Sequence, residues 1–449
     1  MSPRAAGYGE TQPRLDDDRL PVVLVILDGL GDRPVPELGG RTPAEAAHTP
    51  MLDALARRGA SAWHLPFGWG RAPSSELAHW AIFGYHQVPF PGRAVIEALG
   101  GGIEVPYDVP AFHACLRTST IADGKVWITG RAAPDDADDV AALTAELAPV
   151  CREHGVGLHP LPPVGRGEAL LITPDLTSAD VTDSDPFFEN RHPWLRPRPT
   201  APEGTATAEA LTDFLLACRR QLTTGPTNAA RRGHGRPALD VLTTKWAGIR
   251  RPVPGFTEWV GVPGAAVTST RLYRGLAALL SLRDLPIRPR PSLERDLADR
   301  VDAALGLLDD GAAFVHIHTK ATDDAGHRKQ PYAKRDVLEQ LDAGLTGLLT
   351  LADRAVVAVT GDHATPSTGG VLHTGDPTPF VVAGPTVRPD SIDRFGENWA
   401  RAGDYGIITA TDLLPILFGH ANRPAFLGHR PAEHCTIALP DDPMAMPAD

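Results

Sequence analysis

Three short apolar runs, each followed by an acidic residue, constrain the fold of this chain more than any other feature. The runs are PVVLVILDG, AAFVHIHTKATDDAGH and RAVVAVTGDH, and the acids are Asp28, Asp323 and Asp362. Continuous runs rich in β-branched residues are typical of parallel strands that are buried on both faces. The carboxyl ends of parallel strands meet at one edge of a sheet, where ligands bind. The sequence therefore predicts that the three carboxylates share one crevice.

The segments next to these runs have the periodicity of helices. TPAEAAHTPMLDALARRG opens with Thr-Pro and closes on Gly59. SLERDLADRVDAALGLLDDG and AKRDVLEQLDAGLTGLLTLADR repeat apolar residues at three- and four-residue spacing. Because strands and helices alternate, we expect an α/β fold with a doubly wound, mainly parallel sheet.

The middle of the chain, from about Pro106 to Pro237, has a different composition. It is richer in proline and charge, and its apolar runs are shorter. A chain of 449 residues is also longer than one ordinary hydrophobic core requires. Since acid-bearing runs lie on both sides of the middle, we expect a smaller α+β domain inserted into the first. The expected boundaries are 108–237 for the inserted domain, and 1–107 with 238–449 for the core.

Composition excludes several classes of partner. A net charge of −12 argues against nucleic-acid binding, which needs a basic surface. The sequence has neither the ~20 consecutive apolar residues of a spanning helix nor a signal peptide at its start. The four cysteines, Cys115, Cys151, Cys218 and Cys435, are far apart and form no CxxC pair, which indicates reduced thiols. We expect a cytoplasmic protein with no nucleic-acid or membrane partner, of open oligomeric state.

Histidines accompany the three acids at a spacing suited to metal binding. Asp323 precedes His327 by four residues, Asp362 is adjacent to His363, and His373 follows ten residues later. Together with Asp28, these oxygen and nitrogen ligands suffice for two divalent cations. The mixture suits manganese or zinc better than calcium, and magnesium is also compatible.

Each of these features has an ordinary explanation when taken alone. An Asp-Gly pair after a strand, such as Asp28 and Gly29, is usually a turn, and an Asp-x-x-x-His pair is usually a solvated helix face. His316 and His318 within a buried run are expected to be packing residues. The same ligand chemistry at three strand ends favours a metal site.

The stretch GRAPSSELAHW places two serines before a helical pattern. Either Ser74 or Ser75 is expected to cap this helix, with Ser74 the better candidate. A serine at a helix N-terminus beside metal ions is also a nucleophile, because the cations and the helix dipole acidify its hydroxyl. Both roles fit, one for each serine, and Ser75 is the candidate nucleophile.

These motifs together resemble the 2,3-bisphosphoglycerate-independent phosphoglycerate mutases of the archaeal type, in the alkaline phosphatase superfamily. The resemblance spans about Val22 to Val105 and Phe314 to Phe418, and includes VILDGLGDRPVPELGGRTPAEAAHTPMLDALARRG, HTKATDDAGH and HTGDPTPFVVAG. It implies an alkaline-phosphatase-like core and phosphate transfer between hydroxyls of one substrate through a phosphoserine.

The resemblance also implies roles for individual residues. The phosphorylated serine falls on Ser75. One metal ion would be held by Asp323, His327 and His373. The other would be held by Asp28, Asp362 and His363, with Ser75 as a further ligand. The positions implied to contact substrate are Arg93, Lys320, Arg131, Asn228, Arg231 and His113.

The middle segment departs from the family pattern. AFRCNFAT is replaced by AFHACLRT, which puts His113 and Cys115 where the family has Arg and Asn. RGAG is replaced by KWAG, beginning at Lys245. Loss of a charged hydrogen bond costs about 1.5–3 kcal/mol, enough to redirect specificity. We therefore expect a phosphomutase-like enzyme with a divergent small phosphorylated metabolite as substrate. A phosphatase with the same site, and a non-catalytic binding protein derived from the family, are the alternatives.

Overall fold

The computed structural model describes residues 18–185, 191–425, 437, 441 and 446. The N-terminal segment and Cys435, both considered above, lie outside these residues. The chain divides into two compact units. Unit 1 comprises Met1–Phe90, Pro254–Ser269 and Leu280–Asp449, and unit 2 comprises Pro91–Val253 and Thr270–Leu279.

Unit 1 is built on an eight-stranded sheet in the order β10-β9-β11-β1-β12-β13-β2-β14. One strand, β13 (Thr378–Ala383), is antiparallel to its neighbours β12 and β2. The other strands run parallel to one another: β1 (Val22–Leu27), β2 (Gly59–His64), β9 (Gly264–Thr268), β10 (Arg283–Pro286), β11 (Phe314–Thr319), β12 (Val356–Thr360) and β14 (Ile407–Ile408). The predicted α/β fold with a mainly parallel sheet is confirmed.

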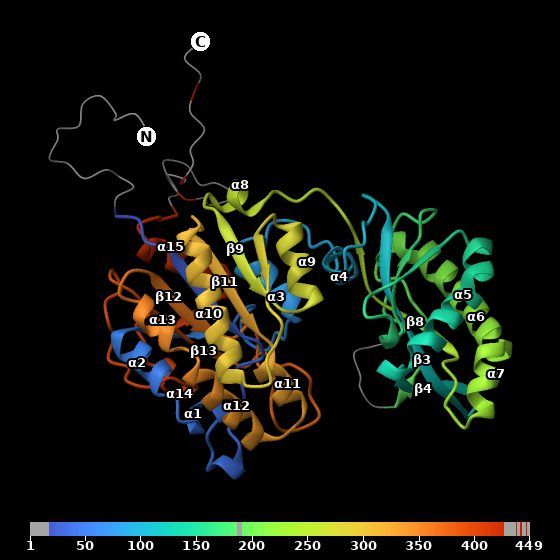
Figure 1. Ribbon diagram of the computed structural model, residues 1–449, viewed down its shortest axis with the longest axis horizontal. Coiled ribbons are helices and arrows are strands. Elements are labelled where there is room, and N and C mark those ends of the chain that lie inside the picture. The colour runs from blue at the N-terminus through green and yellow to red at the C-terminus, as the bar shows by residue number, and fades with distance from the viewer. Residues whose placement is uncertain (1–17, 186–190, 426–436, 438–440, 442–445, 447–449) are drawn as a thin grey trace. The chain divides into compact units, whose positions relative to one another are not determined.

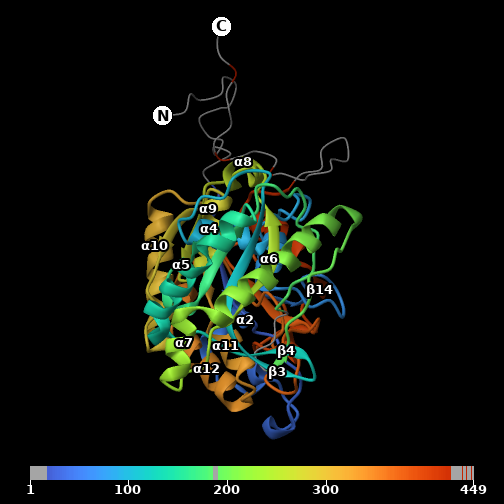
Figure 2. The same ribbon diagram turned by 90° about the vertical axis from the view of Figure 1, so that its right-hand side faces the viewer.

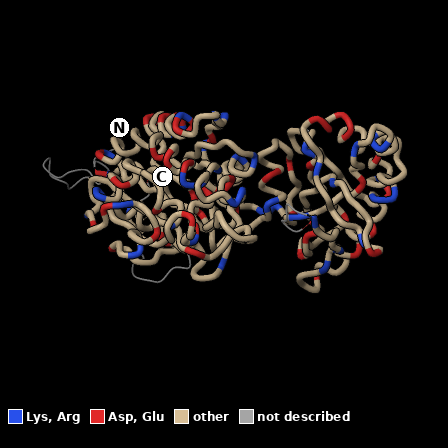
Figure 3. Tube along the Cα trace, turned by 90° about the horizontal axis from the view of Figure 1, so that it is seen from below, with Lys and Arg blue, Asp and Glu red and all other residues tan. Residues whose placement is uncertain are grey.

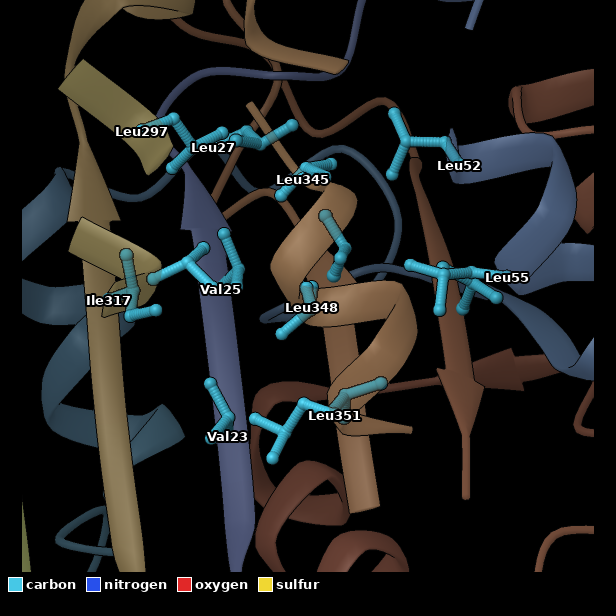
Figure 4. Close-up of a cluster of buried hydrophobic side chains, with 14 of the residues drawn as sticks. Val23, Val25, Leu27, Leu52, Leu55, Leu297, Ile317, Leu345, Leu348 and Leu351 are labelled. Atoms are coloured by element: carbon cyan, nitrogen blue, oxygen red, sulfur yellow. The ribbon is translucent and has the colours of Figure 1, made fainter. Parts of the chain in front are cut away.

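Helices cover both faces of this sheet, so every residue of the central strand β1 is buried. On one face, Val23, Val25 and Leu27 lie beside Leu348 and other side chains around α13 (Thr346–Leu351) (Figure 4). On the other face, the Phe83 ring lies 6.3 Å from that of Phe314 on β11. The remaining helices of unit 1 are α1 (Pro43–Ala46), α2 (Pro50–Arg58), α3 (Ser75–Ile82), α8 (Phe256–Val260), α10 (Leu293–Asp309), α11 (Ala321–His327), α12 (Pro331–Ala343), α14 (Glu397–Ala400) and α15 (Ala410–His420) (Figure 1).

Unit 2 is an antiparallel sheet with helices packed against it. The long strand β3 (Pro110–Ala122) pairs with β4 (Lys125–Arg131), β6 (Glu168–Ile172) and β8 (Val241–Ile249). Strands β5 (Gly157–Pro160) and β7 (His192–Pro193) extend the sheet. Its helices are α4 (Arg93–Gly100), α5 (Ala137–Glu153), α6 (Thr205–Thr224), α7 (Pro226–Gly233) and α9 (Arg271–Leu279), and Figure 2 shows several of them.

Unit 2 has its own hydrophobic core. Leu143 of α5 and Phe214 of α6 pack with Phe112 of β3. The unit extends beyond the expected insertion of 108–237. Strand β8 belongs to it because β8 pairs with β3. Helices α4 and α9 also belong to it, and they pack together where their glycines approach closely.

Charged residues of both signs are distributed along the trace of each unit (Figure 3). Among the described residues, none of the helices is both long enough and apolar enough to cross a bilayer. The three cysteines Cys115, Cys151 and Cys218 are buried as free thiols.

Candidate active site and metal centre

The candidate site forms where three neighbouring parallel strands end. Strand β1 pairs with β11 on one side and β12 on the other, with Leu27 opposite Thr319 and Ile26 opposite Thr360. Asp28 directly follows β1, and Asp362 follows β12 after one residue. The third acid, Asp323, lies on α11, which begins just after β11. This register brings the three acids to one edge of the sheet, as the sequence predicts.

One ligand group consists of Asp323, His327 and His373. The Nε2 atom of His327 lies 3.2 Å from Asp323 Oδ1, and Nε2 of His373 lies 3.6 Å from the same oxygen. The His373 ring is held from its other side by a hydrogen bond between Nδ1 and the carbonyl oxygen of Pro73, at 3.0 Å. One ligand atom from each residue lies within 4.8 Å of the others, so these three residues could hold a metal ion together.

A second group lies deeper and shares Asp323 with the first. Ligand atoms of Asp28, Asp323 and His363 lie within 4.8 Å of one another, and all three residues are buried. His363 Nε2 is 3.3 Å from Asp28 Oδ1 and 3.5 Å from Asp362 Oδ2. The structure thus places Asp323 next to both groups, which the sequence did not indicate.

Asp362 presents one oxygen to this second group. Its Oδ1 accepts a hydrogen bond from the Gly29 backbone N–H at 3.0 Å, whereas its buried Oδ2 has no hydrogen-bond partner. Gly29 has a φ of 64°, and a Cβ there would overlap Thr365 Oγ1. Only glycine therefore lets the chain turn tightly after Asp28 while donating to Asp362.

Ser75 lies against the second group. It is the first residue of α3, and its Oγ is 3.0 Å from His363 Nε2 and 3.4 Å from Asp28 Oδ1. Ser74 occupies the N-cap position but its side chain makes no capping hydrogen bond, so that part of the prediction for Ser74 is wrong. The carbonyl oxygen of Ser75 is 2.8 Å from His79 Nδ1, which ties the first turn of α3 to a buried histidine.

The pKa shifts of two carboxyl groups in the site fit the binding of cations. Burial acts to raise the pKa of Asp28, but the Lys320 ammonium and hydrogen bonds from His318 and His363 hold it well below its usual range. Burial and the neighbouring Asp28 charge raise the pKa of Asp362 well above its usual value. A carboxyl with a raised pKa and an unpartnered oxygen, next to imidazole nitrogens, fits a divalent cation, which would compensate the clustered negative charge.

Two residues that hold the site in place were not predicted from the sequence. His318, expected to be a packing residue, places Nε2 2.9 Å from Asp28 Oδ2 and so orients that carboxylate. Lys334 is fully buried, and its Nζ donates to the carbonyl oxygens of Gly29, Gly31 and Thr365 at 2.8–2.9 Å. Lys334 lies in an amphipathic helix, where a lysine normally indicates the solvent face, so the sequence contains no signal for this role.

Of the residues implied to contact substrate, Lys320 lies in unit 1 beside the ligand groups. Its Nζ is 2.6 Å from Asp323 Oδ2 and 3.7 Å from Asp28 Oδ2, and 41% of its side chain is exposed. Arg93, His113, Arg131, Asn228 and Arg231 all lie in unit 2.

Two of these unit 2 residues make structural contacts. Asn228 donates to the carbonyl oxygens of Leu222 and Leu239, and Arg231 pairs with Asp136 and Asp139. Their polar groups are used within unit 2, and substrate contact by them stays a prediction.

The sequence matches the metalloenzyme superfamily over residues 20–419. The fold and site therefore define a metalloenzyme whose core is an α/β unit with a mainly parallel sheet. Within that class, the chain belongs to the 2,3-bisphosphoglycerate-independent phosphoglycerate mutase family. It is 34% identical to the mutase of Pyrococcus abyssi over 419 residues, covering 90% of this chain and 98% of the relative. It is 33% identical to the mutase of Methanopyrus kandleri, covering 90% and 96%.

Solved structures agree with this assignment. A protein from Pyrococcus horikoshii aligns with a TM-score of 0.73 at 30% identity, over 90% of this chain and 98% of that chain. The cofactor-independent phosphoglycerate mutase of Thermoplasma acidophilum aligns with a TM-score of 0.58 at 29% identity, over 90% and 99%. The family and fold expected from the sequence motifs are confirmed, and the protein is an enzyme of this superfamily.

Proposed function

We propose that this enzyme transfers a phosphoryl group through a phosphoserine at Ser75, on a small phosphorylated metabolite, with two divalent metal ions. The observation that carries the proposal is the position of Ser75 Oγ, 3.0 Å from His363 Nε2 and 3.4 Å from Asp28 Oδ1 at the first residue of α3. The same hydroxyl thus faces a metal-ligand group and the positive end of a helix.

The residues around Ser75 would have different roles in the reaction. The bond from Ser75 Oγ to phosphorus forms as the bond from phosphorus to the substrate oxygen breaks. Ser75 Oγ gives up its proton in this step, and the substrate oxygen takes up one proton. The second half reverses these steps at another hydroxyl of the same molecule. Backbone N–H groups at the start of α3 and the Lys320 ammonium would stabilise charge on the phosphoryl oxygens. Bound metal ions would supply Lewis-acid polarisation and acidify the serine hydroxyl.

Asp323, His327 and His373 are proposed to hold one ion, and Asp28, Asp362, His363 and Ser75 the other. Manganese and zinc suit this mixture of carboxylates and imidazoles, and magnesium is compatible. A cytoplasmic location remains a prediction from the cysteine usage.

A divergent substrate follows from the changes in unit 2, where His113 replaces an arginine of the family pattern and Lys245-Trp246 replaces Arg-Gly. A product assay tests the reaction class and the substrate together. The purified enzyme is incubated with manganese and a panel of phosphorylated metabolites that includes 3-phosphoglycerate, and both isomerised product and free phosphate are followed.

We expect isomerised product from a member of the panel other than 3-phosphoglycerate, with no activity in Ser75→Ala. Ser74→Ala is the matched control, because the Ser74 side chain makes no capping hydrogen bond. Release of phosphate without isomerisation would favour the phosphatase, and absence of any turnover with every metal tested would favour the binding protein.

A further inference from the structure

Lys329 has an unusual backbone conformation for a lysine. It follows α11, which ends at His327, and its backbone N–H donates to the carbonyl oxygen of Gly326 at 3.1 Å. Its φ is 56°, in the left-handed region that residues other than glycine rarely adopt. Glycine is the usual residue at such a position just after a helix. The turn alone therefore does not account for a lysine, which points to a role for its side chain.

The ammonium group of Lys329 joins the two ends of one loop. Its Nζ donates to the carbonyl oxygen of Pro366 at 2.7 Å and to that of Val371 at 2.6 Å. Hydrogen bonds from a charged donor are roughly twice as strong as those between neutral groups. Residues 366–371 are therefore called the clamped loop.

The tip of the clamped loop makes little use of packing. Gly369 and Gly370 are exposed, and a Cβ added to either would meet no atom within 4 Å. The Val371 residue that follows is 40% exposed. Glycines in an exposed loop have high conformational freedom, which destabilises any single arrangement of the backbone. The two hydrogen bonds from Lys329 limit this freedom.

The clamped loop leads directly to His373, which lies two residues after Val371. On the far side of His373, the Thr374 backbone N–H donates to the carbonyl oxygen of Ala364 at 3.0 Å. Lys329 thus holds the chain before His373, and the Thr374 hydrogen bond holds the chain after it.

We propose that Lys329 is a positioning residue for the first ligand group, Asp323, His327 and His373. Its ammonium group holds the clamped loop at the end of α11 and so keeps His373 Nε2 near Asp323 Oδ1, at 3.6 Å. The inference rests on the proposed function, because this group is proposed to hold a metal ion. Ligands that are already in place bind more tightly, since less conformational freedom is lost on binding. Removal of the ammonium group should therefore weaken metal binding without removing a ligand.

Manganese titration of the full chain, freed of metal by chelator and followed by calorimetry, tests the proposal without phosphoryl transfer. His373→Ala removes a proposed ligand and so identifies the binding event that belongs to the first group. Lys329→Met keeps the length of the side chain but not its charge, and we expect it to weaken that event at least tenfold. Lys329→Gly, which also relieves the positive φ, should give a loss of the same size. It replaces Lys329→Met if that variant does not fold.

Lys125→Met is the matched control, because Lys125 is an exposed lysine of β4 in unit 2. It should bind manganese as tightly as wild type. In a His373→Ala background, Lys329→Met should weaken the same event less than threefold, because the side chain that it positions is absent. A merely structural role of Lys329 would not depend on His373 in this way.

Hydrogen exchange in the metal-free protein measures the clamp itself. The Thr374 amide should exchange at least tenfold faster in Lys329→Met and in Lys329→Gly than in wild type, because the chain before His373 is released. An unchanged exchange rate would overturn the inference.

Wild-type manganese affinity in a folded Lys329 variant would also overturn the inference, as would an equal loss with and without His373. If neither variant folds, Lys329 is a residue that the fold requires, and its positioning role is overturned. Failure of the proposed metal set gives a different result, namely unchanged manganese binding in His373→Ala, which overturns the proposed function and this inference together.

Discussion

The buried side chain of Lys334 connects the loop that follows β1 to the loop that follows β12. Its ammonium group donates to the backbone oxygens of Gly29 and Gly31 after β1, and of Thr365 after β12. It also pairs with Asp32 at 3.1 Å, with both side chains fully buried. A group that joins these loops holds Asp28 and Asp362 at a fixed separation.

We expect Lys334→Met to lower the free energy of unfolding by about 3–5 kcal/mol, because it leaves the Asp32 carboxylate buried without its cation. Metal affinity should fall at least tenfold in the same variant. Chemical unfolding and metal titration measure the two effects. The double variant Lys334→Met, Asp32→Asn separates them, since it should recover part of the stability but not the metal affinity. Wild-type metal affinity in folded Lys334→Met would contradict the linking role.

At the scale of elements, α14 joins the loop after β1 to α1 through one buried carboxyl group. Glu397 Oε2 accepts a hydrogen bond from Thr42 Oγ1 at 2.6 Å, and Oε1 accepts one from the Asp32 backbone N–H at 3.2 Å. Burial raises the pKa of Glu397 from 4.5 to about 8, although the Thr42 hydrogen bond opposes this. The folded protein thus holds this proton more tightly than the unfolded chain does.

This pKa predicts how stability depends on pH. The contribution of Glu397 to the free energy of unfolding is fully present below pH 4.5. It is lost as pH rises toward about 8, because the unfolded chain releases the Glu397 proton first. The loss is on the order of a few kcal/mol. Glu397→Gln should remove this part of the decline, measured as the difference in unfolding free energy from wild type between pH 5 and 8.5. The exposed Glu37→Gln is the control, and parallel pH profiles for wild type and Glu397→Gln would contradict the prediction.

At the scale of the whole molecule, the two units have separate hydrophobic cores, and both ligand groups belong to unit 1. Ligand binding stabilises the folded form that holds the site. Metal removal should therefore lower the stability of unit 1 and leave the stability of unit 2 unchanged.

Differential scanning calorimetry with and without chelator tests this separation. We expect two transitions, of which only that of unit 1 shifts to lower temperature when metal is removed. The expected stabilisation is roughly 2.7 kcal/mol at a metal concentration one hundred times Kd. His327→Ala, which removes a proposed metal ligand, should reduce the shift, and an equal shift of both transitions would contradict the assignment.

The main parts of the fold and site follow from local sequence patterns. The runs around β1, β11 and β12 are apolar because both faces of each strand are buried, and the acids after them mark the edge where the proposed metal ligands gather. These patterns extend over only a few neighbouring residues, so they can be recognised in the sequence without a structure.

The features that the sequence did not reveal depend on distant pairing. The antiparallel direction of β13 and the pairing of β8 with β3 join segments that are far apart in the chain. The same is true of Lys334 and Lys329, whose ammonium groups donate to carbonyl oxygens of other segments. A lysine has no local signature for such a position.

The proposed reaction depends on Ser75 as the residue that receives the phosphoryl group. Intact-protein and peptide mass analysis after brief incubation with manganese and each phosphorylated metabolite tests it most directly. We expect one phosphate-sized adduct located on Ser75, absent when chelator is present and absent in Ser75→Ala. Turnover without any adduct at Ser75, or an adduct of the same yield in chelator, would contradict it.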